Sequence, residues 1–184
     1  MTSETVGLMH WRALDRDGED KCRLARVNGG YILVGHARFR DAHGWAALDY
    51  VLRCDGGWLT RSCDVTGTHG GSELGLRLER DGDGWRLNES EQPQLAGCTD
   101  VDLGFTPATN LVPIRRLPEV GSIDTVTARL CLPGPSLERA DQRYTRERGG
   151  YVHVVNGETT AHLAIDGVGF VTEYPGLWEP AHEL

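Results

Sequence analysis

The chain has 184 residues, the size of one ordinary domain, so we expect a single domain over residues 1–184. Acidic residues outnumber basic ones by 27 to 19, and the net charge of −8 argues against a nucleic-acid binder that works through bulk positive charge. No stretch approaches the ~20 apolar residues that span a bilayer, so integral membrane association is not expected.

Short alternating segments dominate the chain. Residues 48–54 alternate apolar and polar side chains as a half-buried strand does, and residues 74–78 and 126–132 repeat the pattern. No segment shows a convincing apolar period of 3.6 residues. The best helix candidate, residues 136–148, lacks an apolar stripe and is interpreted as a long edge strand or a partly irregular segment.

Turn signals rich in glycine separate these strands, and glycine supplies the positive φ that tight hairpin turns require. The signals are Asn28-Gly29-Gly30, Asp55-Gly56-Gly57, Asp81-Gly82-Asp83-Gly84, Asn156-Gly157 and Asp166-Gly167. We count about a dozen strands, and so many antiparallel strands must roll or close to hide their edges. The predicted fold class is therefore all-β, a roll, barrel or half-barrel with little helix.

The turn at Asn156-Gly157 predicts which residues pair across the two strands of its hairpin. A two-residue loop pairs Val155 with Glu158 and Val152 with Ala161. One face then carries Val152, Val154, Ala161, Leu163 and Ile165, and the other carries Tyr151, His153, Thr160 and His162. The second face suits either solvent or the lining of an amphipathic cavity. It places His153 and His162 together without a carboxylate, so no metal site is predicted there.

Four further features carry weaker signals. The five cysteines form no CxxC pair and are expected as buried thiols of a reducing cytosol, with a Cys54–Cys63 bridge as the alternative. The N-terminus lacks a secretory signal, which also favours the cytoplasm. Residues 67–71 are expected as a mobile connection, with an anion-binding loop as the alternative. Residues 174–178 pair two aromatics with a turn and form either a plug or the lip of an apolar cavity.

Asp100 and Asp102 alternate, so in a strand they share a face ~7 Å apart. Two such carboxylates could act as an acid–base pair. The favoured interpretation is a structural network with Arg115 and Arg116, which follow one predicted turn later. Residues 106–110 between them are expected to form an ordered loop.

Gln142, Tyr144 and Arg146 also alternate onto one face. A stacked tyrosine flanked by an arginine and a glutamine suits a sugar or a lipid headgroup. The alternative is an ordinary exposed edge strand.

Several of these segments together resemble the bacterial family named "putative glycolipid-binding" proteins. The central signature is Gly97-Cys98-Thr99-Asp100-Val101-Asp102-Leu103, then Thr106-Pro107-Ala108-Thr109-Asn110 and Pro113-Ile114-Arg115-Arg116-Leu117. Trp11, Gln142-x-Tyr144-Thr145-Arg146 and Tyr174-Pro175-Gly176-Leu177-Trp178 are similar to the opening and the later motifs. The resemblance covers residues 11–178.

The resemblance implies an antiparallel spiral β-roll, similar in shape to bacterial lipoprotein carriers. It implies a non-catalytic binding or carrier protein for an amphipathic ligand, such as a glycolipid or an acylated molecule, and no cofactor. The family has no established catalytic residues to carry over. The candidate ligand-binding residues are Asp100, Asp102, Thr106, Thr109, Asn110, Arg115, Arg116, Tyr144, Arg146 and Trp178.

In this interpretation the arginines face a polar or anionic headgroup, and the alternating Leu and Val faces line the apolar part of a hollow roll. Two other functions stay open. An enzyme acting on a small sugar or acyl substrate would expose both Asp100 and Asp102 at the floor of a pocket. A structural or interaction domain would have a filled interior and a broad apolar interface. A monomer or a homodimer is expected.

Overall fold

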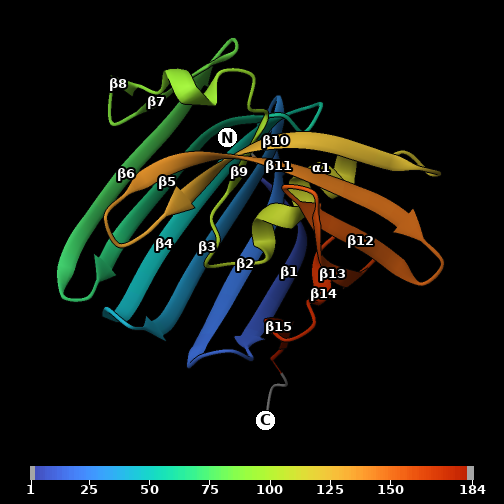
Figure 1. Ribbon diagram of the computed structural model, residues 1–184, viewed down its shortest axis with the longest axis horizontal. Coiled ribbons are helices and arrows are strands. Elements are labelled where there is room, and N and C mark those ends of the chain that lie inside the picture. The colour runs from blue at the N-terminus through green and yellow to red at the C-terminus, as the bar shows by residue number, and fades with distance from the viewer. Residues whose placement is uncertain (1–2, 182–184) are drawn as a thin grey trace.

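The computed structural model describes residues 3–181 and contains two β-sheets that face one another (Figure 1). The larger sheet has nine strands in the order β15-β1-β2-β3-β4-β5-β6-β7-β8. Its strands are β1 (Glu4–Ala13), β2 (Gly18–Val27), β3 (Gly30–Asp41), β4 (Gly44–Asp55), β5 (Thr60–His69), β6 (Ser72–Asp81), β7 (Gly84–Leu87), β8 (Ser90–Glu91) and β15 (Trp178–Pro180).

The second sheet has six strands in the order β14-β13-β12-β11-β10-β9. Its strands are β9 (Asp100–Asp102), β10 (Ser122–Cys131), β11 (Ser136–Glu147), β12 (Gly150–Val155), β13 (Glu158–Ile165) and β14 (Val171–Glu173). All strand pairs are antiparallel except β9 with β10. The all-β prediction is therefore confirmed.

The strands follow the predicted alternation. In β4, Leu48, Tyr50 and Leu52 are fully buried while the residues between them are exposed or half-buried. Residues 136–148, expected as an edge strand or an irregular segment, form strand β11 in the interior of the second sheet. The edge position was wrong because β10 and β12 pair with β11 on either side.

The β12–β13 hairpin confirms the predicted turn and corrects the predicted faces. Asn156 and Gly157 have φ of 49° and 83°, and Val155 pairs with Glu158. A bulge between His153 and Val154 then shifts the register by one residue. His153 consequently pairs with Ala161 and is buried, whereas His162 points outward. The two histidines do not share a face.

Residues 67–71 are not the mobile connection that the glycines suggested. Gly67 to His69 complete strand β5, and only Gly70 and Gly71 form the turn to β6. His69 is buried, and its Nε2 lies 2.8 Å from Asp41 Oδ2. Pairing of residues 67–69 with β4 holds this part of the segment in the sheet.

The space between the sheets is filled by side chains. The connection from β8 to β10 contains the 3-10 helices η1 (Pro93–Leu95) and η2 (Ala108–Asn110) and the only α-helix of residues 3–181, α1 (Leu111–Arg116). Within this connection, η2 and α1 lie between the two sheets, whereas η1 lies at the edge beside β7 and β8 (Figure 1). Leu95, Leu103, Ala108 and Leu111 are at most 1% exposed and join one core with both sheets. The expected apolar hollow is therefore occupied.

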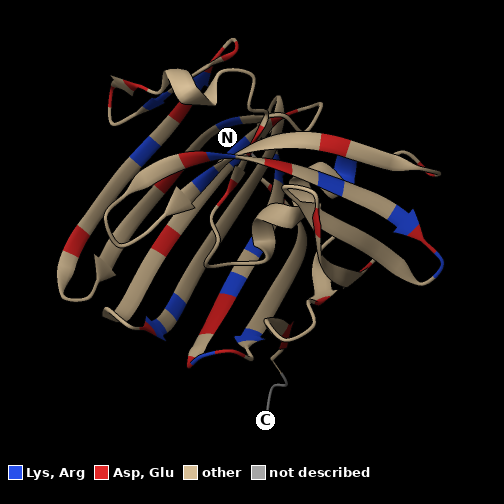
Figure 2. Cartoon of the chain, in the orientation of Figure 1, with Lys and Arg blue, Asp and Glu red and all other residues tan. Residues whose placement is uncertain are grey.

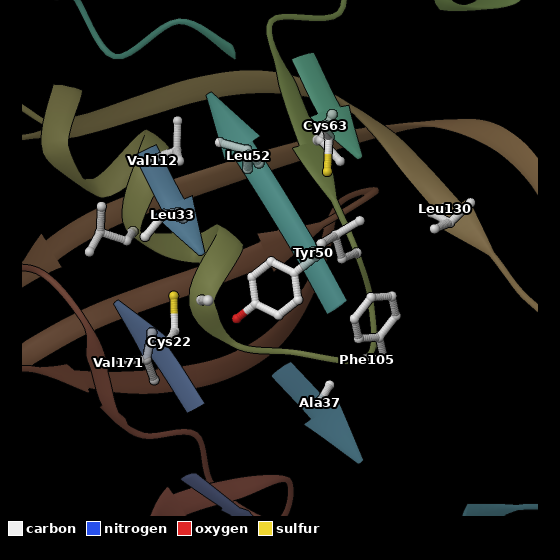
Figure 3. Close-up of a cluster of buried hydrophobic side chains, with 14 of the residues drawn as sticks. Cys22, Leu33, Ala37, Tyr50, Leu52, Cys63, Phe105, Val112, Leu130 and Val171 are labelled. Carbon is white, nitrogen blue, oxygen red and sulfur yellow. The ribbon is translucent and has the colours of Figure 1, made fainter. Parts of the chain in front are cut away.

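Tyr50 lies at the centre of this core, with Phe105 on one side and Cys22 on the other (Figure 3). Its ring crosses the neighbouring strand at Gly35, its register partner in β3. A Cβ atom at Gly35 would lie 2.0 Å from the Tyr50 ring, so only glycine leaves room for the tyrosine.

All five cysteines are free, and four of them are buried, as expected. Cys54 pairs with Thr60 and Cys63 pairs with Leu52, so the alternative of a Cys54–Cys63 bridge is wrong. Charges of both signs alternate along the strands of both sheets (Figure 2). Among residues 3–181, no helix is long and apolar enough to cross a bilayer.

Candidate functional site

An open cleft of about 780 Å³ lies where four segments of the second sheet and the C-terminal region meet. The segments are the β9–η2 connection, strand β10, the tip of the β12–β13 hairpin and the turn before β15. The lining residues are Asp102, Gly104, Thr106, Pro107, Asn110, Arg129, His153, Val155, Asn156, Glu158, Thr159, Thr160, Tyr174, Leu177 and Trp178.

Asp102 places a carboxylate in this cleft with a fixed orientation. Its Oδ2 accepts hydrogen bonds from Gln142 Nε2 at 2.9 Å and from Arg129 Nε at 3.2 Å. Its Oδ1 accepts one from the Gly104 backbone N–H at 2.9 Å. The parallel pairing of β9 with β10 sets Arg129 directly beside Asp102. The ion pair with Arg129 and the three hydrogen bonds therefore hold the carboxylate in one orientation.

A chain of polar side chains continues from Asp102 beneath the cleft. His153 Nε2–H donates to Gln142 Oε1 at 3.2 Å, and Tyr174 Oη–H donates to His153 Nδ1 at 3.3 Å. The His153 ring stacks on Tyr144, with 4.4 Å between ring centroids. Burial lowers the pKa of His153 from 6.5 to about 4, so the imidazole is neutral at pH 7.

The floor of the cleft is held by the η2 segment. Tyr144 Oη–H donates to Asn110 Oδ1 at 2.7 Å, and Asn110 Nδ2 in turn donates to the Pro107 carbonyl at 3.1 Å. Thr106 donates through its hydroxyl to Asp20, a carboxylate that has no exposed surface. These bonds orient the Asn110 amide and the Thr106 hydroxyl before any ligand arrives.

Asp20 is an ionisable group in the core directly behind Thr106. Its Oδ2 accepts from Tyr50 Oη–H at 2.8 Å as well as from Thr106, while its Oδ1 has no partner among residues 3–181. Burial raises the pKa of Asp20 from 3.8 to about 6. Asp20 does not line the cleft, so its contact with the site runs through Thr106.

Two aromatic side chains close one end of the cleft. Tyr174 and Trp178 form an isolated β-bridge around the turn that connects them, and both line the cleft. The Arg16 guanidinium lies 5.7 Å from the Trp178 ring centroid and 4.7 Å from that of Phe39. Residues 174–178 therefore combine the two roles that the sequence offered as alternatives. The Tyr174 and Trp178 rings are largely buried, as in a plug, and they also border the cleft, as a lip does.

Asp100 does not take part in the cleft. Arg116 donates from Nη1 to Asp100 Oδ1 at 2.7 Å and from Nη2 to Oδ2 at 2.6 Å, and Asp100 is 1% exposed. Thr99 and Thr125 hydroxyls also donate to Oδ2. The favoured structural network is thus present for Asp100 with Arg116. The enzyme hypothesis required both carboxylates to be exposed in one pocket, and Asp100 is not exposed there.

The predicted site residues fall into separate groups. Asp102, Thr106, Asn110 and Trp178 line the cleft, and Tyr144 supports it from beneath. Thr109 is buried in η2. Asp100 and Arg116 form the sealed ion pair. Arg115 and Arg146 lie together in a different groove.

Sequence reasoning missed Arg129 and Glu158 as cleft residues, and it offered His153 only on a face that suited either solvent or a cavity lining. Arg129 reaches Asp102 only through the parallel β9–β10 pair, which spans distant residues and leaves no local signal. His153 was placed on a shared face with His162 because the bulge was not visible. Glu158 could have been found, since it follows the predicted turn directly. Within residues 3–181, no three His, Cys, Asp or Glu side chains are grouped to hold a metal ion.

Comparisons with known proteins agree with this architecture. A model of the family described as "Putative glycolipid-binding" matches residues 8–180. A crystal structure of a DUF1089 family protein from Pseudomonas aeruginosa is similar with a TM-score of 0.75 and 26% identity, over 88% of this chain and 91% of that one. A comparison with curated proteins gave no match. Because the family model spans nearly the whole chain, this chain belongs to the "putative glycolipid-binding" family.

Proposed function

We propose that the cleft binds the sugar headgroup of an amphipathic ligand, such as a glycolipid, without catalysing a reaction on it. One observation carries the proposal: an oriented carboxylate, an oriented amide and two aromatic rings converge on one open cleft. These are Asp102, Asn110, Tyr174 and Trp178. The volume of about 780 Å³ falls within the ~300–1,000 Å³ of small-molecule sites.

The chemistry of the lining favours a neutral polyhydroxylated group. Carboxylate and amide oxygens accept hydrogen bonds from sugar hydroxyls, and an aromatic ring packs against the apolar face of a sugar. The cleft holds two carboxylates, Asp102 and Glu158, against one guanidinium, Arg129. A neutral sugar therefore fits better than an anionic one.

In this proposal the acyl chain of the ligand does not lie against the alternating Leu and Val faces, which is where the sequence analysis expected it. The Leu rows of β4 and β6 are buried in the core except for Leu74, which is half-buried, so they offer little surface to an acyl chain. Besides Pro107 and the aromatic rings, the apolar side chains that border the cleft are Val155 and Leu177. The apolar part of the ligand would lie along this rim and stay partly in contact with solvent. The five free thiols favour a reducing compartment such as the cytoplasm for this function.

The test is a titration with octyl glycosides below their micelle concentrations, with glucose, galactose, mannose and N-acetylglucosamine heads. Binding is measured by isothermal titration calorimetry and by the NMR shift of the Trp178 indole N–H. We expect saturable binding of at least one glycoside with a shift of that resonance. Native mass spectrometry of the freshly purified protein, followed by lipid extraction, searches for a co-purified ligand.

Two variants connect the binding to the cleft. Glu158→Gln changes an exposed hairpin residue and Asp102→Asn changes the oriented carboxylate, and each should weaken binding about 10-fold, since a hydrogen bond to a charged group contributes ~1.5–3 kcal/mol. Asp141→Asn, an exposed carboxylate on β11 outside the cleft, is the matched control and should bind as wild type does. Absence of binding to every glycoside together with no co-purified lipid would overturn the proposal.

A further inference from the structure

A second groove, of about 390 Å³, lies between the end of α1, strands β11 and β12, and the loop from β13 to β14. It shares no lining residue with the cleft. Its lining residues are Ile114, Arg115, Leu117, Arg146, Tyr151, Ile165, Asp166, Gly167, Val168 and Gly169. The groove thus combines two guanidinium groups with three large aliphatic side chains.

Arg115 is held at this groove by neutral groups. Its Nη1–H donates to the Val168 carbonyl at 3.1 Å, and its guanidinium lies 4.9 Å from the Trp58 ring centroid. Among residues 3–181, no carboxylate lies within ion-pairing distance of Arg115. The guanidinium is therefore oriented while its charge is not compensated.

Arg146 is held in the same way. Its Nε–H donates to the Pro118 carbonyl at 3.3 Å and its Nη1–H donates to Tyr151 Oη at 2.6 Å. The described part of the chain offers it no carboxylate partner either. Arg143, three residues earlier on β11, shows the contrast, because it makes a two-pronged ion pair with Asp124 at 2.5 and 2.8 Å.

Among residues 3–181, Asp166 is the one carboxylate that lines the groove, and its hydrogen bonds stabilise the loop from β13 to β14. Its Oδ1 accepts the backbone N–H groups of Val168, Gly169 and Phe170 at 2.8 to 2.9 Å. The same loop supplies the Val168 carbonyl that holds Arg115. Two guanidiniums against one carboxylate leave the groove with a net positive charge in a chain of net charge −8.

We propose that this groove is a second ligand site, which binds a phosphate monoester through Arg115 and Arg146. A guanidinium presents a planar fork of donors that matches phosphate oxygens. An alkyl group on the phosphate would pack against Ile114, Leu117 and Ile165. The proposal does not depend on the sugar site, because the two sites share no residue.

The experiment titrates the full chain with monooctyl phosphate below its micelle concentration and with inorganic phosphate, by calorimetry and by ³¹P NMR line broadening. We expect saturable binding of octyl phosphate that weakens as salt is raised. Binding of octyl phosphate that is 10-fold or more tighter than that of inorganic phosphate identifies an alkylated ligand. Equal binding of the two identifies a free phosphate group as the ligand.

Arg115→Gln and Arg146→Gln should each weaken binding of the phosphate probe at least 10-fold. Both side chains are exposed, so both variants should fold. Arg143→Gln removes an arginine from the same strand outside the groove and should bind as wild type does. Asp102→Asn should also leave phosphate binding unchanged, which separates this site from the cleft. No saturable binding of either probe, or equal weakening by Arg143→Gln, would overturn the proposal.

Discussion

At the scale of residues, environment rather than type separates the two aspartates of strand β9. Asp100 is sealed from solvent by Arg116, whereas Asp102 opens into the cleft beside Arg129. Both are paired with arginine, yet only Asp102 keeps part of its surface for a ligand, with 20% of the side chain exposed. Asp100 thus stabilises the fold, whereas Asp102, two residues later, is accessible to a ligand.

Arg116→Ala should destabilise the protein strongly, because it leaves the buried Asp100 carboxylate without its counter-charge. Breaking a buried ion pair by removing one partner costs ~3–5 kcal/mol. Urea unfolding at pH 7 measures the change in the free energy of unfolding. Arg143→Ala is the matched control, since it breaks a solvent-exposed pair with Asp124 and should change stability much less.

The double variant Arg116→Ala/Asp100→Asn tests whether the unpaired Asp100 charge causes the loss of stability. It should recover part of the loss, because the amide removes the unpaired charge. Equal destabilisation by Arg116→Ala and Arg143→Ala would contradict the assignment of Asp100 and Arg116 as a buried pair.

At the scale of elements, the sequence predicted the strands and turns that depend on residues close together in the chain. The Leu rows of β4 and β6 and the Asn156-Gly157 turn followed directly from alternation and from turn chemistry. Helix α1 was missed because six residues make less than two turns and show no period. Its Pro113 is tolerated because it lies in the first turn.

The candidate site was predictable to the same degree. The motif residues Asp102, Thr106 and Asn110 do meet in one cleft, since they lie within nine residues of one another. Arg129 depends on the parallel β9–β10 pair, which no local pattern encodes. Arg115 and Arg146 were grouped with the cleft, but neighbouring side chains of the helix and the strand point to different surfaces.

The close contact between the Tyr50 ring of β4 and Gly35 of β3 gives the prediction at this scale. Gly35→Ala should destabilise the protein by ~1–3 kcal/mol or more, because the new methyl group would overlap the buried Tyr50 ring at 2.0 Å. Gly75→Ala is the matched control, a strand glycine of β6 with no atom near its would-be Cβ, and it should be neutral or slightly stabilising. Urea unfolding measures both.

Tyr50→Leu tests the cause of that loss. If the overlap with the ring is responsible, Gly35→Ala should be less destabilising in the Tyr50→Leu background than in wild type. A Gly35→Ala protein as stable as the Gly75→Ala protein would show that the contact between residue 35 and the Tyr50 ring tolerates a methyl group.

At the scale of the whole molecule, a filled roll places ionisable side chains in its interior. Asp20 lies at the larger sheet and His153 at the smaller one, and both belong to the polar networks behind the cleft floor. Burial favours the neutral form of each, so it raises the pKa of Asp20 to about 6 and lowers the pKa of His153 to about 4. These two shifts affect stability in opposite directions over the same range of pH.

Between pH 4 and 6 the folded chain holds more protons on Asp20 than the unfolded chain, so the free energy of unfolding falls as pH rises. For His153 the unfolded chain holds more protons, so the free energy of unfolding rises with pH. Each shift of roughly two units corresponds to ~3 kcal/mol. In wild type the two contributions therefore largely cancel.

Single substitutions should separate the two contributions. Asp20→Asn mimics the neutral carboxyl and keeps an acceptor for Tyr50 and Thr106, so its stability relative to wild type should increase by ~3 kcal/mol from pH 4 to pH 6.5. His153→Phe keeps the stack on Tyr144, and its stability relative to wild type should decrease by a similar amount over that range. Urea unfolding at half-unit steps of pH measures both differences. A difference between Asp20→Asn and wild type that does not change with pH would mean that Asp20 stays ionised inside the fold.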